Sequence, residues 1–206
     1  MLADDFFRLA HSDATGQPHL HLRAVGIGLA AALLGELTSA RRIEVRGGEL
    51  VVLDPTPPTD LVAHAVLDVL IAEQGRHPVR IWLDYLSRTA RGQVSARLLR
   101  SGHLREVTSR RLLRSSVTWL PTDMNEAARP WAALSTRLRT GQRLDYDMAC
   151  LAGLTLATGL DRFVLETAPP QAFDHLRQVA DGLWPPMRDL FAHTQAAIGD
   201  AVLARR

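Results

Sequence analysis

Apolar residues along most of the chain recur at the three- and four-residue spacing of amphipathic helices, and short turn sequences separate these stretches. Residues 22–40 differ, because they are apolar almost all round, which predicts a helix buried in the core. Their longest apolar run, residues 24–35, is twelve residues, short of the roughly 20 that a membrane-spanning helix needs. The pattern predicts helices over residues 3–10, 22–40, 61–74, 79–88, 94–102, 125–138, 146–158, 172–182 and 186–204.

The helix over residues 61–74 has the clearest start and stop signals. The turn DPTPPTD precedes it and offers Thr59 or Asp60 as the N-cap, and Gly75 ends it. Its amphipathic stripe is expected to contain Leu61, Ala65, Leu67, Val69 and Leu70.

Two pairs of short segments predict β-hairpins. IEV and ELVVLD flank the turn RGG at residues 46–48, and HLREV and LLRSSVTWL flank TSRR, which is expected near the tip at residues 108–111. The chain is therefore predicted to be mainly α, a single domain of amphipathic helices around the buried helix, with two projecting hairpins. Each hairpin follows a helix, which is also the layout of a winged helix, so DNA is a competing partner.

Charge is distributed unevenly. The chain has 24 arginines, no lysine and 22 acidic residues, for a net charge of +2. Residues 88–114 contain eight of these arginines and one acid, a charge of +7, whereas the remaining sixteen arginines and 21 acids give −5. The lysine-free composition suggests a GC-rich bacterial source of actinobacterial type, but such a bias does not explain the clustering. A solvated surface would mix acids among the bases, so the segment predicts an anion-binding surface.

Nucleic acid and an anionic membrane are the two partners that such a surface fits. Arginine forms fork-shaped bidentate contacts to phosphate in either setting. The second hairpin places Leu112 and Leu113 among Arg110, Arg111 and Arg114. Exposed leucines ringed by arginine fit a lipid headgroup layer better than a DNA groove.

Other candidate chemistry is weak. GIGLAA at residues 26–31 fits a dinucleotide fingerprint if HLRAV before it is a strand, but no alternation of strand and helix follows. His11, His19 and His21 could bind zinc, although such spacing is common by chance. Cys150 is the only cysteine, and no nucleophile motif is present, so neither a reaction nor a metal or cofactor is predicted.

The whole chain resembles the Golgi phosphoprotein 3 (GPP34) family, whose members are cytosolic adaptors that recognise phosphatidylinositol 4-phosphate on Golgi membranes. No single stretch decides the resemblance, but the order and spacing of several do. They are residues 2–16, 28–45, 54–70, 88–91, 98–104, 146–164 and the last helix. The resemblance implies one Golgi phosphoprotein 3-like domain over residues 1–206.

The resemblance also implies which residues hold the headgroup. In the family these are an aromatic residue before the buried helix, an arginine on that helix, and two arginines three apart. The last two correspond to Arg88 and Arg91, whose spacing would let both guanidinium groups grip one phosphate. The helix arginine corresponds to Ala30, and the aromatic position falls near His21, with Arg23 close enough to compensate.

We therefore predict a non-enzymatic, peripheral membrane protein that binds phosphatidylinositol 4-phosphate or another anionic phospholipid. It would be cytoplasmic and lie on the inner face of the membrane. Arg97 and Arg100 would add nonspecific attraction, and the hairpin over 103–120 would contact the membrane or a second subunit. The resemblance also admits a protein cargo. The alternative is a winged-helix protein that places the helix over 92–101 in a nucleic-acid groove.

Overall fold

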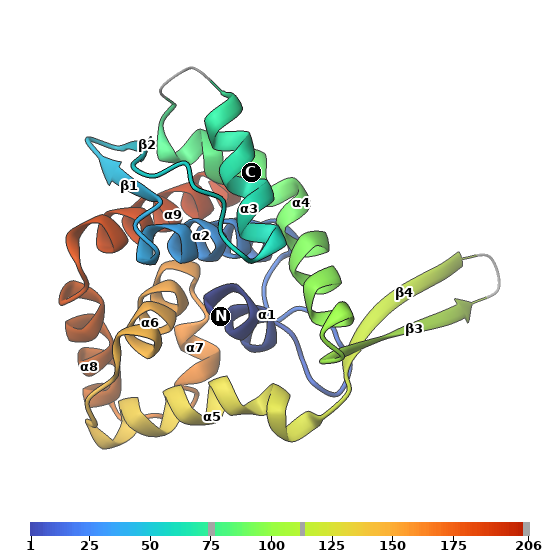
Figure 1. The fold of residues 1–206 in the computed structure, drawn as a ribbon. Coiled ribbons are helices and arrows are strands. Elements are labelled where there is room, and N and C mark those ends of the chain that lie inside the picture. Colours follow the sequence, from blue (N-terminus) through green and yellow to red (C-terminus); the bar gives the residue numbers. More distant parts are fainter. Residues whose placement is uncertain (74–76, 112–113, 204–206) are drawn as a thin grey trace.

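The computed structural model describes residues 1–73, 77–111 and 114–203, and for residues 109–111, 114–116 and 202–203 the backbone alone. The protein is mostly helical (65%), which confirms the predicted mainly-α domain (Figure 1). In chain order the elements are α1 (Leu2–Ala10), α2 (Leu22–Ser39), β1 (Ile43–Arg46), β2 (Glu49–Val52), α3 (Leu61–Ala72), α4 (Val79–Arg100), β3 (Leu104–Arg111), β4 (Arg114–Pro121), α5 (Met124–Thr140), α6 (Tyr146–Thr158), α7 (Asp161–Val164), α8 (Pro170–Asp181) and α9 (Pro185–Leu203).

Helix α2 forms the centre of the core, as its all-round apolar pattern predicted, and α1, α3, α4, α6 and α9 pack around it (Figure 1). Its glycines allow close packing: a Cβ on Gly26 would lie 2.7 Å from the carbonyl oxygen of Ser87, and one on Gly28 would lie 2.4 Å from Phe6. Both glycines are inside a helix, and residues 22–25, which the dinucleotide fingerprint would need as a strand, are its first turn. The dinucleotide interpretation is therefore wrong.

Helices α2 and α4 run side by side in the same direction. The side chains of Arg23 and Asp84 are hydrogen-bonded, as are those of Glu36 and Arg97, and each pair is separated by 61 positions. This constant offset places the beginnings of both helices at one end of the molecule. Helix α4 extends about one turn further, because it begins at Val79.

Both predicted hairpins are present. Strands β1 and β2 pair antiparallel around Gly47 and Gly48, whose φ angles of +59° and +81° favour glycine. Strands β3 and β4 pair over eight positions, and the hairpin projects from the helices (Figure 1). Residues 108–111, predicted near the tip, are the last four residues of β3 and pair with β4.

Two helix predictions need correction. The segments over 79–88 and 94–102 form one helix of 22 residues, because no proline interrupts them and Gly92 costs an exposed helix only about 1 kcal/mol. In α3, Asp60 is the N-cap and Leu67 and Leu70 are buried, but Leu61 and Ala65 are exposed. Because nearly every residue of α3 is apolar, its pattern did not specify which side faces inward.

A buried arginine joins four segments of the chain. The guanidinium group of Arg97 on α4 donates hydrogen bonds to Asp4 Oδ1 (2.8 Å), Glu36 Oε2 (3.2 Å) and Asp60 Oδ1 (3.0 Å). Arg97 is only 8% exposed, so the expectation that it attracts a membrane surface is wrong. The carboxylates around it make this side chain part of the core.

The pKa values of Glu36 and Arg97 are both raised in this cluster, but for different reasons. Burial raises the pKa of Glu36, and the charge of Arg97 opposes that rise without cancelling it. Burial lowers the pKa of Arg97, but Glu36, Asp4 and Asp60 together outweigh it and raise the value overall. Arg97 therefore stays protonated and charged, whereas Glu36 takes up a proton more readily than an ordinary glutamate does.

Candidate functional site

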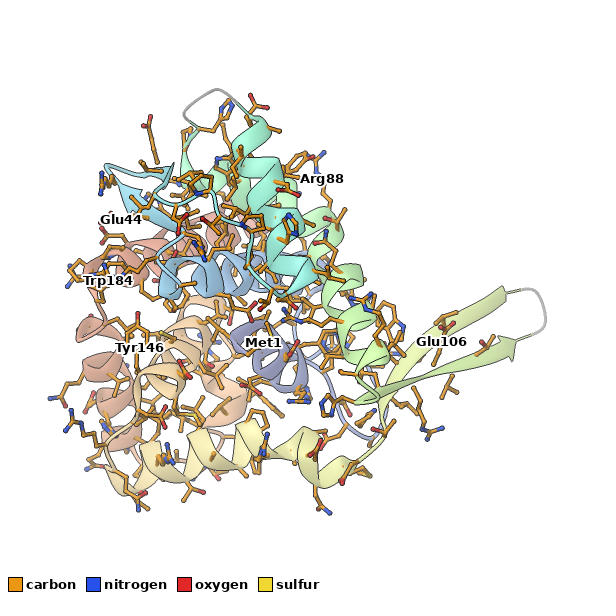
Figure 2. All side chains as sticks on the ribbon, viewed as in Figure 1. Met1, Glu44, Arg88, Glu106, Tyr146 and Trp184 are labelled. Carbon is orange, nitrogen blue, oxygen red and sulfur yellow. The ribbon has the colours of Figure 1, made fainter. Side chains whose placement is uncertain are left out.

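The clearest cationic site lies where α2 begins beside α4. One carboxylate, Asp84, accepts hydrogen bonds from Arg23 Nη2 (3.0 Å) and from Arg88 Nη2 (2.9 Å). All three side chains are 42–71% exposed, and Figure 2 shows Arg88 at the outer edge of α4. Two cations share one anion, so the group has a charge of +1. Ion pairs this exposed are worth at most about 1 kcal/mol each, so a ligand can replace them.

The first turn of α2 adds to this positive character. His21 is the N-cap, and its Nδ1 accepts a hydrogen bond from the Arg23 backbone N–H (3.1 Å). That turn contains no acidic residue. The N–H groups at a helix start carry a partial positive charge that a nearby carboxylate usually complements. Here an arginine occupies the position instead, which favours an external anion.

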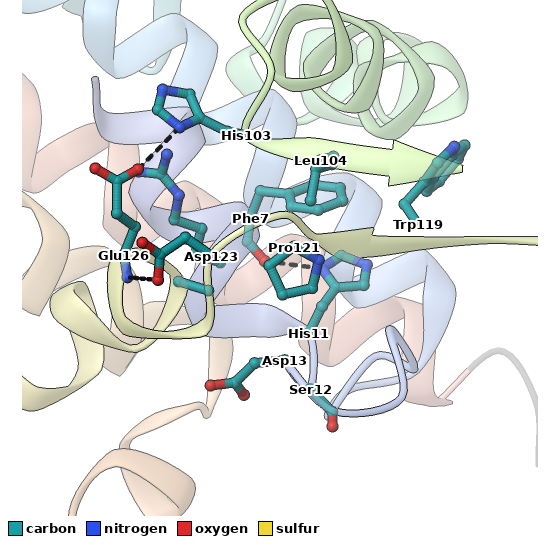
Figure 3. A pocket seen from close by; sticks show the side chains of 12 residues that line it. Phe7, His11, Ser12, Asp13, His103, Leu104, Trp119, Pro121, Asp123 and Glu126 are labelled. Carbon is teal, nitrogen blue, oxygen red and sulfur yellow. Dashed lines mark hydrogen bonds and ion pairs between the residues drawn. The ribbon is translucent and has the colours of Figure 1, made fainter. Parts of the chain in front are cut away.

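Arg91 has different neighbours. Its guanidinium carbon lies 4.7 Å from the centroid of the Trp119 ring, and its Nε lies 3.4 Å from His11 Nε2. The His11 ring stacks on Phe7 at 4.1 Å between centroids, and its Nδ1 lies 2.8 Å from the Phe7 carbonyl oxygen. Figure 3 shows Phe7 of α1 and His11, which follows it, beside Leu104, Trp119 and Pro121 at the base of the β3–β4 hairpin.

Burial lowers the pKa of His11 to about 4, so the ring is neutral at physiological pH. With the proton on Nδ1, donated to the Phe7 carbonyl, Nε2 is free to accept a hydrogen bond from Arg91. Burial also lowers the pKa of Arg91, which nevertheless remains charged. The arginine therefore connects the middle of α4 to the hairpin base through its cation–π contact with Trp119, and to the end of α1 through His11.

The structure brings some of the predicted headgroup residues together and leaves Arg91 apart from them. It brings Arg23 and Arg88 together through Asp84, beside His21. Within the described residues, Arg88 and Arg91 share no hydrogen-bond or ring partner. Asp84 could have been found from the sequence, because it precedes Arg88 by four residues on one helix. Trp119 could not, because its contact with Arg91 joins distant segments.

The arginine-rich segment is not one continuous patch. Arg97 is buried among acids, whereas Arg100 and Arg105 are exposed on α4 and β3. Of the residues predicted for hairpin contacts, Leu112 and Leu113 lie outside the described residues, as do the side chains of Arg110, Arg111 and Arg114.

Arg88 also forms part of a groove between α3 and α4. The groove has a volume of about 670 Å³, and its lining residues carry no negative charge. They are Leu61, Val62, Ala65, Arg88, Thr89, Gly92, Gln93, Ala96 and Arg100. The pocket of Figure 3, between Phe7, His11 and Trp119, has only about 20 Å³, which suits one water molecule.

The histidines proposed for zinc take other roles. His11 stacks on Phe7, His19 stacks on Phe163 at 3.9 Å, and His21 caps α2. Across the described ranges, no group of three His, Cys, Asp or Glu side chains is placed to hold a metal ion. Cys150 is buried, and burial raises the pKa of its thiol to about 11.

One known protein family matches most of the chain. The family model of Golgi phosphoprotein 3 (GPP34) matches residues 2–194. The chain belongs to the Golgi phosphoprotein 3 family. A search of curated proteins finds no match. This family is non-enzymatic and is associated in general with phosphoinositide and membrane binding.

The position predicted to replace an arginine of the Golgi phosphoprotein 3 family lies inside the core. Ala30 is fully buried in α2, and its correspondence to that arginine stays a prediction. In the part of the chain that the structure describes, α2 alone is long and apolar enough to cross a membrane, and 72% of it is buried inside the domain. Its apolar length is thus accounted for by the core. A peripheral mode of membrane association fits the family.

Proposed function

We propose that the protein is a peripheral membrane protein that binds the phosphorylated headgroup of an anionic phospholipid, phosphatidylinositol 4-phosphate or a related lipid. The observation that carries the proposal is the pair of exposed arginines, Arg23 and Arg88, that share one carboxylate beside the start of α2. A phosphate can replace Asp84 as the acceptor for both guanidinium groups, and it brings more charge and more acceptor atoms.

Each residue has a distinct role in this proposal. Arg88 and Arg23 grip the phosphate, and His21 holds the first turn of α2 in place. Arg91 lies about one turn further along α4, where Trp119 and His11 fix its side chain. It contributes positive potential there rather than a second fork on the same phosphate. The protein would act at the cytoplasmic face of a membrane, and self-association through the hairpin and a protein cargo remain predictions, as does its bacterial origin.

Vesicle co-sedimentation tests this proposal. Neutral vesicles are compared with vesicles that contain a generic anionic lipid or phosphatidylinositol 4-phosphate at matched charge. The Arg23→Ala/Arg88→Ala variant is expected to bind anionic vesicles about thirtyfold more weakly, because each lost arginine removes about 1 kcal/mol. The matched control, Arg177→Ala/Arg188→Ala, removes two exposed arginines from α8 and α9 and should bind as wild type does.

The outcomes separate the alternatives. Preference for phosphatidylinositol 4-phosphate means that this pocket recognises the headgroup without an arginine at Ala30. Equal binding to both anionic lipids means that the site is an electrostatic anchor for any such lipid. Wild-type levels of binding by the Arg23→Ala/Arg88→Ala variant would overturn the site.

Duplex DNA, added as a competitor, tests the winged-helix alternative. The helix over 92–101 that it would use is largely the second half of α4, and the burial of Arg97 leaves Arg100 as the exposed arginine there, which weighs against this alternative. Tight DNA binding without vesicle binding would overturn the membrane proposal.

A further inference from the structure

Large apolar side chains are exposed at the end of the molecule where Arg23 and Arg88 meet. Leu22 is 52% exposed, Ile81 is 54% exposed and Tyr85 is 52% exposed. These are half or more of the area that each side chain can offer to water. Exposed apolar residues are ordinary when single, but here they lie beside a pair of cations.

Helical geometry places these residues on neighbouring surfaces. Ile81, Tyr85 and Arg88 follow one another at spacings of four and three residues, so they form one stripe on the outer side of α4. Leu22 precedes Arg23, whose guanidinium group reaches Asp84 on that same helix. Because α2 and α4 are parallel with an offset of 61 positions, Leu22 lies at the level of the turn between Ile81 and Tyr85.

The arginine pair at this end suits a lipid surface. Asp84 is the acid between the two arginines, and both of them already neutralise it. A layer of anionic headgroups offers phosphates to the arginines and, just beneath them, the apolar boundary that leucine and isoleucine prefer. Tyrosine also favours this depth, because its ring is apolar and its hydroxyl group remains hydrated.

We propose that Leu22, Ile81 and Tyr85 enter the interfacial layer of an anionic membrane when Arg23 and Arg88 bind its phosphates. The inference rests on the proposed function and adds which face touches the bilayer. The outer side of the first turns of α4, together with the start of α2, lies against the membrane. The predicted insertion of the β3–β4 hairpin would be a separate contact, since β3 begins beyond the other end of α4.

Thiol labelling with an environment-sensitive dye tests which face enters the membrane. Native Cys150 is 2% exposed and its thiol pKa is raised to about 11, so added surface cysteines label selectively. Tyr85→Cys and Leu22→Cys report on the proposed face. Gln171→Cys, exposed on α8, is the control, and Val117→Cys reports on the hairpin.

On anionic vesicles, the dyes at positions 22 and 85 are expected to shift to the blue and brighten at least about twofold, while the dye at 171 stays unchanged. Vesicle-bound protein whose dyes at 22 and 85 remain in water would overturn the inference and leave the proposed headgroup site intact. A response at 117 without one at 22 and 85 would overturn it in favour of the hairpin. Absence of vesicle binding by unlabelled wild type would overturn both proposals.

Serine substitutions separate apolar contact from charge. At about 1 M salt the Debye length is about 3 Å, so the attraction between the arginines and the anionic lipids is largely screened. Under these conditions Ile81→Ser/Tyr85→Ser should weaken the remaining vesicle binding about tenfold, or about 1.4 kcal/mol. Trp131→Ser is the matched control, because Trp131 is an exposed apolar residue on α5. Equal residual binding by the double variant and the control would contradict the inference. Urea unfolding checks that both variants are folded.

Discussion

Replacing Arg97 with alanine tests whether the buried ion cluster holds the helices together. The substitution leaves Glu36 and Asp4, which are 12% and 16% exposed, without their cation. Removing one partner of a buried ion pair costs about 3–5 kcal/mol, because the remaining charge stays out of water. Since a domain of this kind is stable by about 5–15 kcal/mol, the variant would lose a large share of its free energy of unfolding.

The loss should depend on pH through Glu36. Its pKa is already raised by burial, and without Arg97 it rises further. Between the ordinary pKa of a glutamate and this raised value, the folded protein holds a proton that the unfolded chain has released. The stability of Arg97→Ala should therefore fall by up to about 1.4 kcal/mol for each unit of rising pH in that range. The variant is expected to be closest to wild type near pH 5.

Urea denaturation followed by circular dichroism, at pH 5 and pH 8, measures both effects. Arg100→Ala is the matched control, because Arg100 is exposed three residues further along the same helix. Its free energy of unfolding should change by less than about 0.5 kcal/mol. A loss in Arg97→Ala no greater than in the control would refute the reasoning about the cluster. A loss that grows as pH falls would refute the role given to Glu36.

Three further experiments test other parts of the structure. Asp84→Asn removes the carboxylate that competes with a phosphate for both arginines, so anionic vesicles should bind the variant about threefold to tenfold more tightly in co-sedimentation. Gly26→Ala should lower the free energy of unfolding by about 1–3 kcal/mol, because the new methyl group meets the Ser87 carbonyl, whereas Gly92→Ala, with open space, should raise it by about 0.5–1 kcal/mol. Cys150 should resist alkylation at pH 8 until urea unfolds the protein, since burial raises the pKa of its thiol to about 11.

The sequence predicted the helices and hairpins well where one local signal was decisive. The all-round apolar run over 22–40 predicted a buried helix and the glycine pair at 47 and 48 predicted a hairpin turn, and both elements are present. The pattern failed where apolar residues occupy several sides of a helix. In α3 this ambiguity left Leu61 and Ala65 exposed, against expectation.

The candidate site was predictable only in part, because charge density along a sequence does not specify partners in space. Arg88 and Asp84 are one helical turn apart, so their pairing follows from local spacing. Arg97 belongs to the same arginine-rich segment, but carboxylates from three distant segments surround it. The contact of Arg91 with Trp119 likewise depends on how the hairpin returns to the helices.

The constant offset between α2 and α4 has a consequence for synthesis of the protein. Helix α2 is apolar enough to enter a bilayer, yet α4, one of the helices that cover it, is made 61 residues later. At about 5–20 residues per second, the ribosome needs about 3–12 seconds to supply that cover. During this interval α2 is an exposed hydrophobic segment, which chaperones and the membrane insertion machinery can bind. The speed of translation between the two helices is therefore expected to influence how much of the protein reaches its folded state.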